Sequence, residues 1–105
     1  MWIAKNITTQ STFLVTAGPA DLVAVIVNTG AAAAVCKIFD STSGAGVSVA
    51  SIDASATNTF FYGNTCLNGI TAVTSGGNAD ITVVYIDYPM GTRPDDIQQT
   101  VLADR

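Results

Sequence analysis

Apolar residues in the stretch 66–88 fall into two short runs that flank a polar, glycine-bearing break. Residues 70–73 precede the break at 75–78, and residues 81–86 follow it. Side chains alternate between two faces along a β-strand, and both runs fit that period. Glycine and asparagine accept the backbone angles of tight connections, so we expect the two strands to form a β-hairpin.

The second of these runs is apolar on both of its faces. Ile81, Val83 and Tyr85 share one face. Val84 and Ile86 lie on the other face, together with Thr82 and Tyr88. A strand with two apolar faces needs two covers, and a chain of 105 residues readily supplies one. We therefore expect another subunit to cover the second face.

Further stretches with the strand period are residues 12–16, 21–28, 35–40, 47–53 and 57–62. The stretch 21–28 is again apolar on both sides, with Leu22, Ala24 and Ile26 alternating with Val23, Val25 and Val27. Lys37 marks its side of the strand 35–40 as the solvent side.

Two local irregularities accompany these strands. The apolar phase of residues 47–53 shifts after Val49, which predicts a β-bulge near Ala50 or Ser51. Residues 31–34 are four alanines, a length too short to nucleate a helix, so we expect a loop there.

This spacing of short strands predicts an all-β chain with a single β-sandwich of about seven to eight strands over residues 11–88, jelly-roll or immunoglobulin-like. Residues 1–10 are expected to form an N-terminal arm or an edge strand. Residues 89–105 differ in composition and form a C-terminal tail.

The tail has the features of one short helix. Thr92 and Asp95 have the spacing of a capping box, and Pro94 lies in a first-turn position. Ile97 and Val101 are four residues apart and would share a helix face. The alternative is an extended arm along a neighbouring subunit.

Composition narrows the classes of function. Hydrophobic residues make up 49% of the chain, charged residues make up 11%, and the net charge is −4. With only four cationic residues no basic patch for nucleic acid is expected. The apolar runs are too short for a membrane helix, and the first residues lack the apolar core of a signal peptide. We therefore expect synthesis in a cytoplasm and no membrane partner.

The chain lacks the usual equipment for catalysis. It has no histidine, two cysteines and scattered aspartates. No catalytic, cofactor-binding or metal-ligating residues are therefore expected. Cys36 and Cys66 are expected to be buried, reduced thiols, with a disulfide between them as the alternative.

Several strand and turn motifs together resemble small β-sandwich virion proteins of tailed bacteriophages. The motifs are VIVNTG at 25–30, IFD at 38–40, IDA at 52–54, NGITAV at 68–73, and ADITV at 79–83 followed by Tyr85. The resemblance covers residues 12–88. Members with an assigned role resemble head decoration, cement or fibre-base proteins.

The resemblance implies a non-enzymatic structural protein that decorates or cements the capsid exterior of a phage. It would be a homotrimer on the virion surface, bridging major capsid subunits and stabilising the head. One alternative is a carbohydrate- or host-binding module of a tail or fibre, with Trp2, Tyr62, Tyr85 and Tyr88 as its candidate aromatics. Another is an accessory subunit of a cellular assembly.

The surplus apolar strand face and the two chain ends are the expected protein-interaction residues. They are Trp2, Ile3, Val84, Ile86, Tyr88, Ile97, Val101 and Leu102. We expect the terminal members of this set to hold the shell or an adjacent subunit. The alternative for Trp2 and Ile3 is that they fold back on the core of their own domain.

Overall fold

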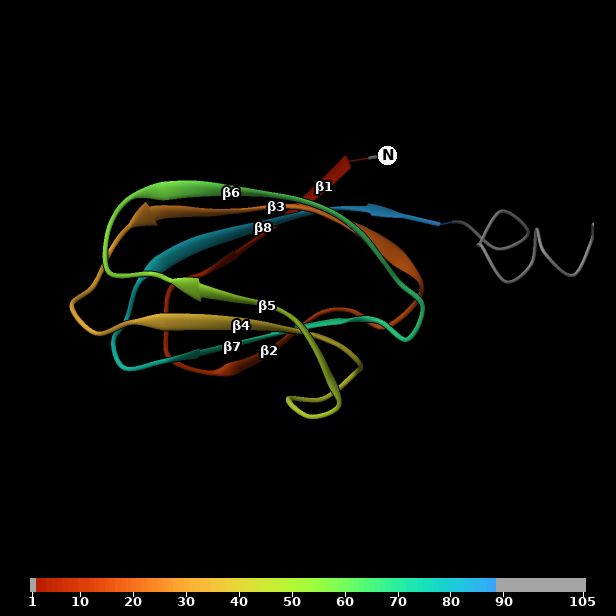
Figure 1. The fold of residues 1–105 in the computed structure, drawn as a ribbon, viewed down its shortest axis with the longest axis horizontal. Helices are drawn as coiled ribbons and strands as arrows, with labels where there is room; N and C mark the ends of the chain where they lie inside the picture. The colour runs from red at the N-terminus through yellow and green to blue at the C-terminus, as the bar shows by residue number, and fades with distance from the viewer. Residues whose placement is uncertain (1, 89–105) are drawn as a thin grey trace, which may run out of the picture.

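The computed structural model describes residues 2–88, which form eight β-strands in two layers (Figure 1). The strands are β1 (Trp2–Ile7), β2 (Thr12–Thr16), β3 (Ala20–Thr29), β4 (Val35–Asp40), β5 (Val47–Asp53), β6 (Asn58–Cys66), β7 (Ile70–Ser75) and β8 (Asp80–Asp87). The predicted all-β fold with a single sandwich is confirmed.

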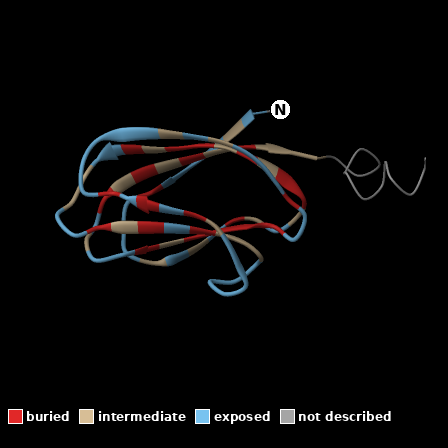
Figure 2. Ribbon diagram, viewed as in Figure 1, coloured by how far each residue is buried: buried red, intermediate tan, exposed pale blue. Residues whose placement is uncertain are grey.

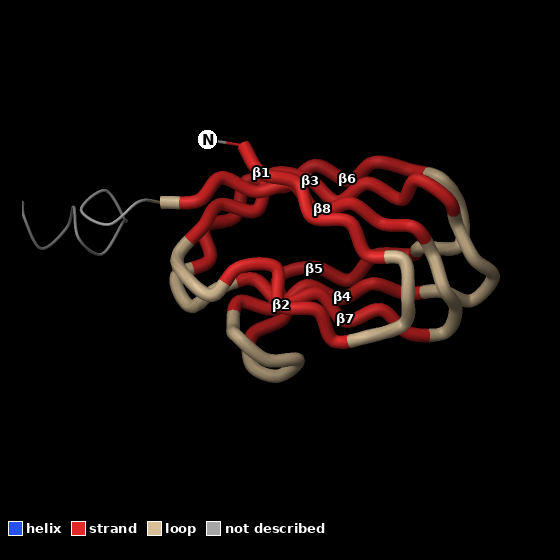
Figure 3. Tube along the Cα trace, turned by 180° about the vertical axis from the view of Figure 1, so that it is seen from behind, coloured by secondary structure: helices blue, strands red, loops and turns tan. Residues whose placement is uncertain are grey.

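Each layer is an antiparallel sheet of four strands. The first sheet has the order β1-β8-β3-β6, and the second sheet has the order β2-β7-β4-β5. Figure 3 shows the two layers from behind. In sequence order the first strand pairs with the last, the second with the seventh, the third with the sixth and the fourth with the fifth. This set of pairs, β1–β8, β2–β7, β3–β6 and β4–β5, is the strand order of a jelly roll.

The expected hairpin in residues 66–88 is wrong, although both of its strands exist. β7 pairs with β2 and β4, whereas β8 pairs with β1 and β3 in the other sheet. β7 buries Ile70, Ala72 and Thr74, and β8 buries Ile81, Val83 and Tyr85. Because the chain crosses from one sheet to the other, these two apolar faces meet across the core instead of lying side by side.

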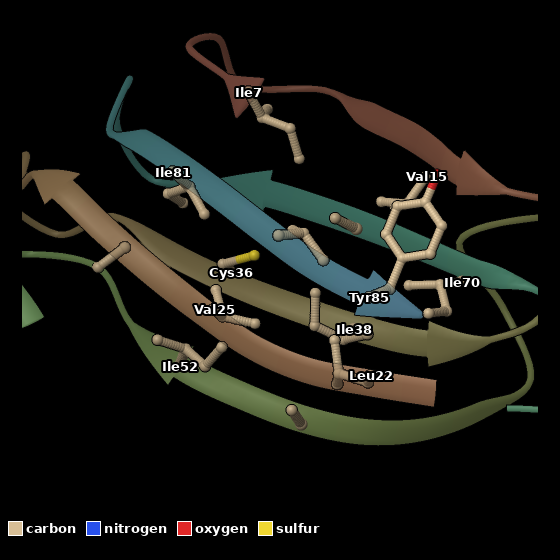
Figure 4. Packing of buried hydrophobic residues seen from close by; sticks show 14 of the residues in the cluster. Ile7, Val15, Leu22, Val25, Cys36, Ile38, Ile52, Ile70, Ile81 and Tyr85 are labelled. Atoms are coloured by element: carbon tan, nitrogen blue, oxygen red, sulfur yellow. The ribbon is translucent and has the colours of Figure 1, made fainter. Parts of the chain in front are cut away.

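The core fills the space between the sheets, as Figure 4 shows. Leu22, Val25 and Ile81 from the first sheet face Cys36, Ile38 and Ile52 from the second, and all six are fully buried. Figure 2 shows buried residues alternating with less buried ones, as the period of two requires, and this alternation is regular in β4, β5 and β8.

β3 departs from the predicted alternation. Its pairing with both β6 and β8 shifts register between Leu22 and Ala24. Leu22 lies in the core, but after the shift Val25 and Val27 take the core side. Ala24 and Ile26 therefore turn to the outside, which corrects the prediction that they share a face with Leu22.

Other local predictions are confirmed. Ile38 pairs with Ala50 and Phe39 with Ser48, so β5 carries its bulge at Val49, next to the predicted position. Lys37 is exposed while its neighbours Cys36 and Ile38 are buried. The four alanines form a turn in which the amide of residue 34 donates to the carbonyl of residue 31.

The structure tests the prediction for the N-terminal segment but not the prediction for the C-terminal segment. Of the two expectations for the N-terminal segment, the structure has an edge strand, β1, paired with β8. The helix or extended arm expected after Thr92 lies outside the described residues. Within residues 2–88 no helix is long and apolar enough to cross a membrane.

Candidate protein-interaction surface

The outer face of the first sheet is defined by its register. Residues that pair across antiparallel strands project from the same face. One row across the sheet is Trp2, Ile86, Asp21 and Thr65; the next is Ala4, Val84, Ala24 and Phe61; the third is Asn6, Thr82, Ile26 and Thr59. The alternate residues of β8, Ile81, Val83 and Tyr85, point into the core.

An apolar band runs across this outer face over all four strands. We call Trp2, Ala24, Ile26, Phe61, Val84 and Ile86 the outer band. Trp2 is 67% exposed and Phe61 is 80% exposed, at the two edges of the sheet. Ile26, Val84 and Ile86 are half-buried by their strand neighbours and do not pack on the core. Within residues 2–88 no other segment covers this face.

A cluster of hydrogen-bonded polar side chains borders the outer band at the end of the sheet where β8 begins. Asn6 Nδ2 donates to Asp80 Oδ1 at 2.6 Å, and Asn28 Nδ2 donates to Thr82 Oγ1 at 2.8 Å. Asn28 Nδ2 also lies 3.3 Å from Asp80 Oδ1, so one carboxylate joins three strands. The cluster fixes the strand ends and places a negative charge beside the apolar residues.

The carboxylate of Asp21 borders the outer band at the opposite end. Asp21 Oδ1 accepts a hydrogen bond from Thr65 Oγ1 at 2.7 Å, and Asp21 Oδ2 accepts one from the Tyr88 hydroxyl. The bond to this carboxylate raises the pKa of Tyr88, because it stabilises the protonated phenol. The outer face of the first sheet thus has an apolar centre and one aspartate at each end.

The outer face of the second sheet is different, because the chain covers part of it. A Cβ atom on Gly44 would lie 3.0 Å from Val73 Cγ2 and 3.3 Å from Thr12 Cγ2, so the loop after β4 lies against this face. Thr71 Oγ1 donates to the carbonyl of Ser41 at 2.8 Å and ties the same loop down. Exposed Lys37 occupies the centre of this sheet.

The edge strands carry features that discourage pairing with another chain. On β1, Lys5 lies on the same side as the inward-facing Ile3 and Ile7, and an inward-facing charge blocks strand addition. The edge strands β2, β5 and β6 each have a shifted register against their neighbour, and bulges twist an edge away from a new partner. The broad open surface is therefore a face, not an edge.

The cysteines lie in the core, away from this surface. Cys36 and Cys66 are both free thiols and fully buried. Burial raises the pKa of each thiol to about 11, and for Cys36 the neighbouring Thr74 hydroxyl partly offsets this effect. Neither thiol is thus a thiolate at neutral pH. In the described part of the chain, no three Cys or Asp side chains come together where they could hold a metal ion.

The structure brings together four of the predicted interaction residues. Trp2, Val84 and Ile86 belong to the outer band, and Tyr88 borders it through Asp21. Ile3 instead points inward and packs against the core. Ile97, Val101 and Leu102 lie outside the described residues.

Three members of the band, Ala24, Ile26 and Phe61, are not among the predicted interaction residues. In the sequence Phe61 alternates with Phe60 and Tyr62, which pack against the core, and this alternation is a signal that Phe61 points away from the core. Ile26 was hidden by the bulge in β3, which no residue in the stretch announces.

The fold and the surface together define a class: a small jelly-roll sandwich with one apolar outer face that no segment of residues 2–88 covers. Comparison of the chain with protein-family models, with curated proteins and with solved structures found no match.

Proposed function

We propose that this protein is a structural component of a phage virion that decorates or cements the capsid exterior, and that it docks there through the outer band. The observation that carries the proposal is the open apolar face, with Trp2 and Phe61 exposed at its edges. Soluble proteins rarely leave such a patch uncovered unless it binds a partner.

A protein surface fits this face better than a carbohydrate does. Sugar sites combine aromatic rings with polar groups that bind hydroxyls. Between Trp2 and Phe61 the face instead has half-buried Val84 and buried Ala24, and the Asn6–Asp80 and Thr65–Asp21 hydrogen bonds lie at its two ends. An apolar centre with a polar rim is the usual arrangement of a protein–protein interface.

The phage context rests on the resemblance of residues 12–88 to small virion proteins. The jelly-roll order agrees with it, since this architecture is frequent in viral capsids, but it also occurs in lectins. The partner in this proposal is the major capsid protein. Attachment to several capsid subunits would stabilise the assembled head, because the protein binds that state preferentially.

Trimerisation is part of the proposal and explains how a small face could suffice. A standard interface buries about 800 Å² on each partner. A band of six side chains is smaller than that, so one copy alone would bind weakly. Three linked copies on a repeating shell gain affinity through multivalency. Light scattering should give three times the chain mass of 10.8 kDa; a stable monomer at micromolar concentration would contradict the trimer.

The direct test is binding of purified variants to empty capsids of the phage that encodes the protein. Phe61→Ser should reduce occupancy about tenfold or more, since a buried phenylalanine contributes about 1.5–3 kcal/mol. Leu14→Ser is the matched control, because Leu14 is also an exposed apolar residue but belongs to the second sheet. Co-sedimentation measures both.

Equal binding by the two variants would exclude the outer band as the docking surface. If Leu14→Ser alone lost binding, the second sheet would be the docking face. Specific binding to a glycan, with none to capsids, would favour the host-recognition alternative.

A further inference from the structure

Asp80 lies at one end of the outer band with one carboxylate oxygen unused by the described chain. Its Oδ1 accepts hydrogen bonds from the side-chain amides of Asn6 and Asn28. Its Oδ2 accepts none from residues 2–88. The lysines in that part of the chain lie elsewhere, Lys5 on the inward-facing side of β1 and Lys37 on the second sheet. No cation of residues 2–88 therefore pairs with this carboxylate.

The two asparagines add further acceptors beside this oxygen. Each uses its Nδ2 as a donor, Asn6 to Asp80 Oδ1 and Asn28 to Thr82 Oγ1. Their Oδ1 atoms, bonded to the same carbons as these nitrogens, accept no hydrogen bond within residues 2–88. Three oxygen acceptors without a donor from the described chain thus gather at this end of the face. A lysine or arginine side chain, which carries only donors and a positive charge, is what such a group binds.

The opposite end of the band is different. Asp21 uses both of its oxygens within the chain, because Oδ1 accepts a hydrogen bond from Thr65 Oγ1 and Oδ2 accepts one from the Tyr88 hydroxyl. The two carboxylates at the ends of the face are therefore not equivalent. Asp80 is the one with an oxygen left for the cation of a partner.

The register fixes how far these acceptors are from the apolar centre. Thr82 lies in the same row as Ile26, and Asp80 is two residues before it on β8, about 7 Å along the strand. The row of Val84 and Phe61 is four residues from Asp80, roughly 14 Å along the strand. A partner that covers the outer band therefore reaches Asp80 with the rim of its contact surface, where charged groups are usual.

A second copy of the same face does not supply the cation. This face has Asp21 at one end and Asp80 at the other, and neither described lysine belongs to it. Two such faces packed together in either orientation would set carboxylates opposite carboxylates.

We infer that the partner of the outer band carries a lysine or arginine that pairs with Asp80, roughly 14 Å from the apolar residue that packs beside Val84. The inference rests on the proposed function, in which the partner is the major capsid protein, and it adds the chemistry of the partner's surface. Complementary charge at the rim fixes the orientation of docking. It also makes capsid binding sensitive to salt, because salt screens exposed ion pairs.

Asp80→Asn tests the inference, because it removes the charge and keeps an oxygen that can accept from Asn6 and Asn28. Asp40→Asn is the matched control. Asp40 is the last residue of β4 in the second sheet, and its Oδ1 also accepts a hydrogen bond, from the amide of Asn68. The two variants have the same net charge, so a general effect of charge on capsid binding would appear in both. A urea midpoint close to the native one establishes that each variant is folded.

Co-sedimentation with empty capsids is measured at about 0.05 M and about 0.5 M NaCl. At low salt Asp80→Asn should bind about fivefold more weakly than the native chain, whereas Asp40→Asn should bind as the native chain does. At high salt the affinity of the native chain should fall to that of Asp80→Asn. A chelator of divalent metals should change none of these values, because the cation belongs to a side chain.

Native affinity of Asp80→Asn at low salt would overturn the inference, and loss of binding by Phe61→Ser in the same assay would leave the docking surface in place. Equal weakening of Asp80→Asn and Asp40→Asn would also overturn it, since net charge alone would then matter. A defect of Asp80→Asn that persists at high salt would assign Asp80 to holding the strand ends, and loss of native binding with the chelator would make the cation a metal ion. Absence of capsid binding by the native chain at both salt concentrations would reject the proposed function together with this inference.

Discussion

Gly76 makes the tightest backbone approach of any described glycine. Its φ is +83°, and a Cβ atom there would lie 2.0 Å from the carbonyl oxygen of Ala33. Ala33 itself has a φ of 66°, so two turns with unusual backbone angles meet at this end of the sandwich. This contact lets the short connection between β7 and β8 cross from one sheet to the other.

The first prediction is that Gly76→Ala lowers the free energy of unfolding by about 3 kcal/mol, from the left-handed backbone angle and the overlap with Ala33. Gly63→Ala is the control, since a Cβ there meets nothing within 4 Å, and it should change stability by less than about 0.5 kcal/mol. Urea unfolding measures both. Equal stability of the two variants would show that the crossing does not depend on this contact.

The second prediction concerns pH. The pKa values of Cys36 and Cys66 are raised from 9.0 to about 11 by burial, so the folded state keeps both protons where the unfolded chain loses them. The stabilisation is complete below pH 9 and is lost as the pH rises toward 11, at most roughly 3 kcal/mol for each thiol. The raised pKa of Tyr85 acts in the same direction.

Urea midpoints measured from pH 7 to pH 10.5 should therefore fall above pH 9, and they should fall less in a Cys36→Ala, Cys66→Ala variant. The native thiols should react with a disulfide reagent only after unfolding, two per chain. Rapid reaction of the folded protein at pH 8 would contradict the burial of the thiols.

At the scale of elements, the strands were largely predictable and their partners were not. Residues 35–40 and 47–53 were predicted with the bounds that the structure has, because alternation is a local property. The hairpin failed because a short glycine-bearing connection can lead either to a neighbouring strand or to the opposite sheet. Ile26 was assigned to the wrong face because a bulge reverses the alternation without a residue signal.

The third prediction concerns the edge strand β1. Lys5→Val would remove the inward-facing charge and extend the apolar side that Ile3 and Ile7 begin, which opens the edge to pairing. Lys37→Val removes the same charge from β4, a central strand that has no free edge. Light scattering during mild heating should show association of the first variant at a lower temperature than the second. The opposite order would indicate that β1 is not a protected edge.

At the scale of the molecule, the two sheets have different outer faces. The second sheet is partly covered by the loop after β4, which lies against Val73, and it carries Lys37. The first sheet has an apolar centre with Asp21 and Asp80 at its ends. The sequence predicted that a surplus apolar face exists on β8. Its extent across four strands depends on the strand order, which local patterns do not contain.

Radical footprinting on assembled capsids asks directly whether the outer band is the docking surface. Phe61 and Val47 are similarly exposed in the free protein, at 80% and 68%, but only Phe61 belongs to the band. On capsids, oxidation of Phe61 should fall severalfold while that of Val47 is unchanged. Protection of Val47 with full labelling of Phe61 would show that the protein docks through a different surface.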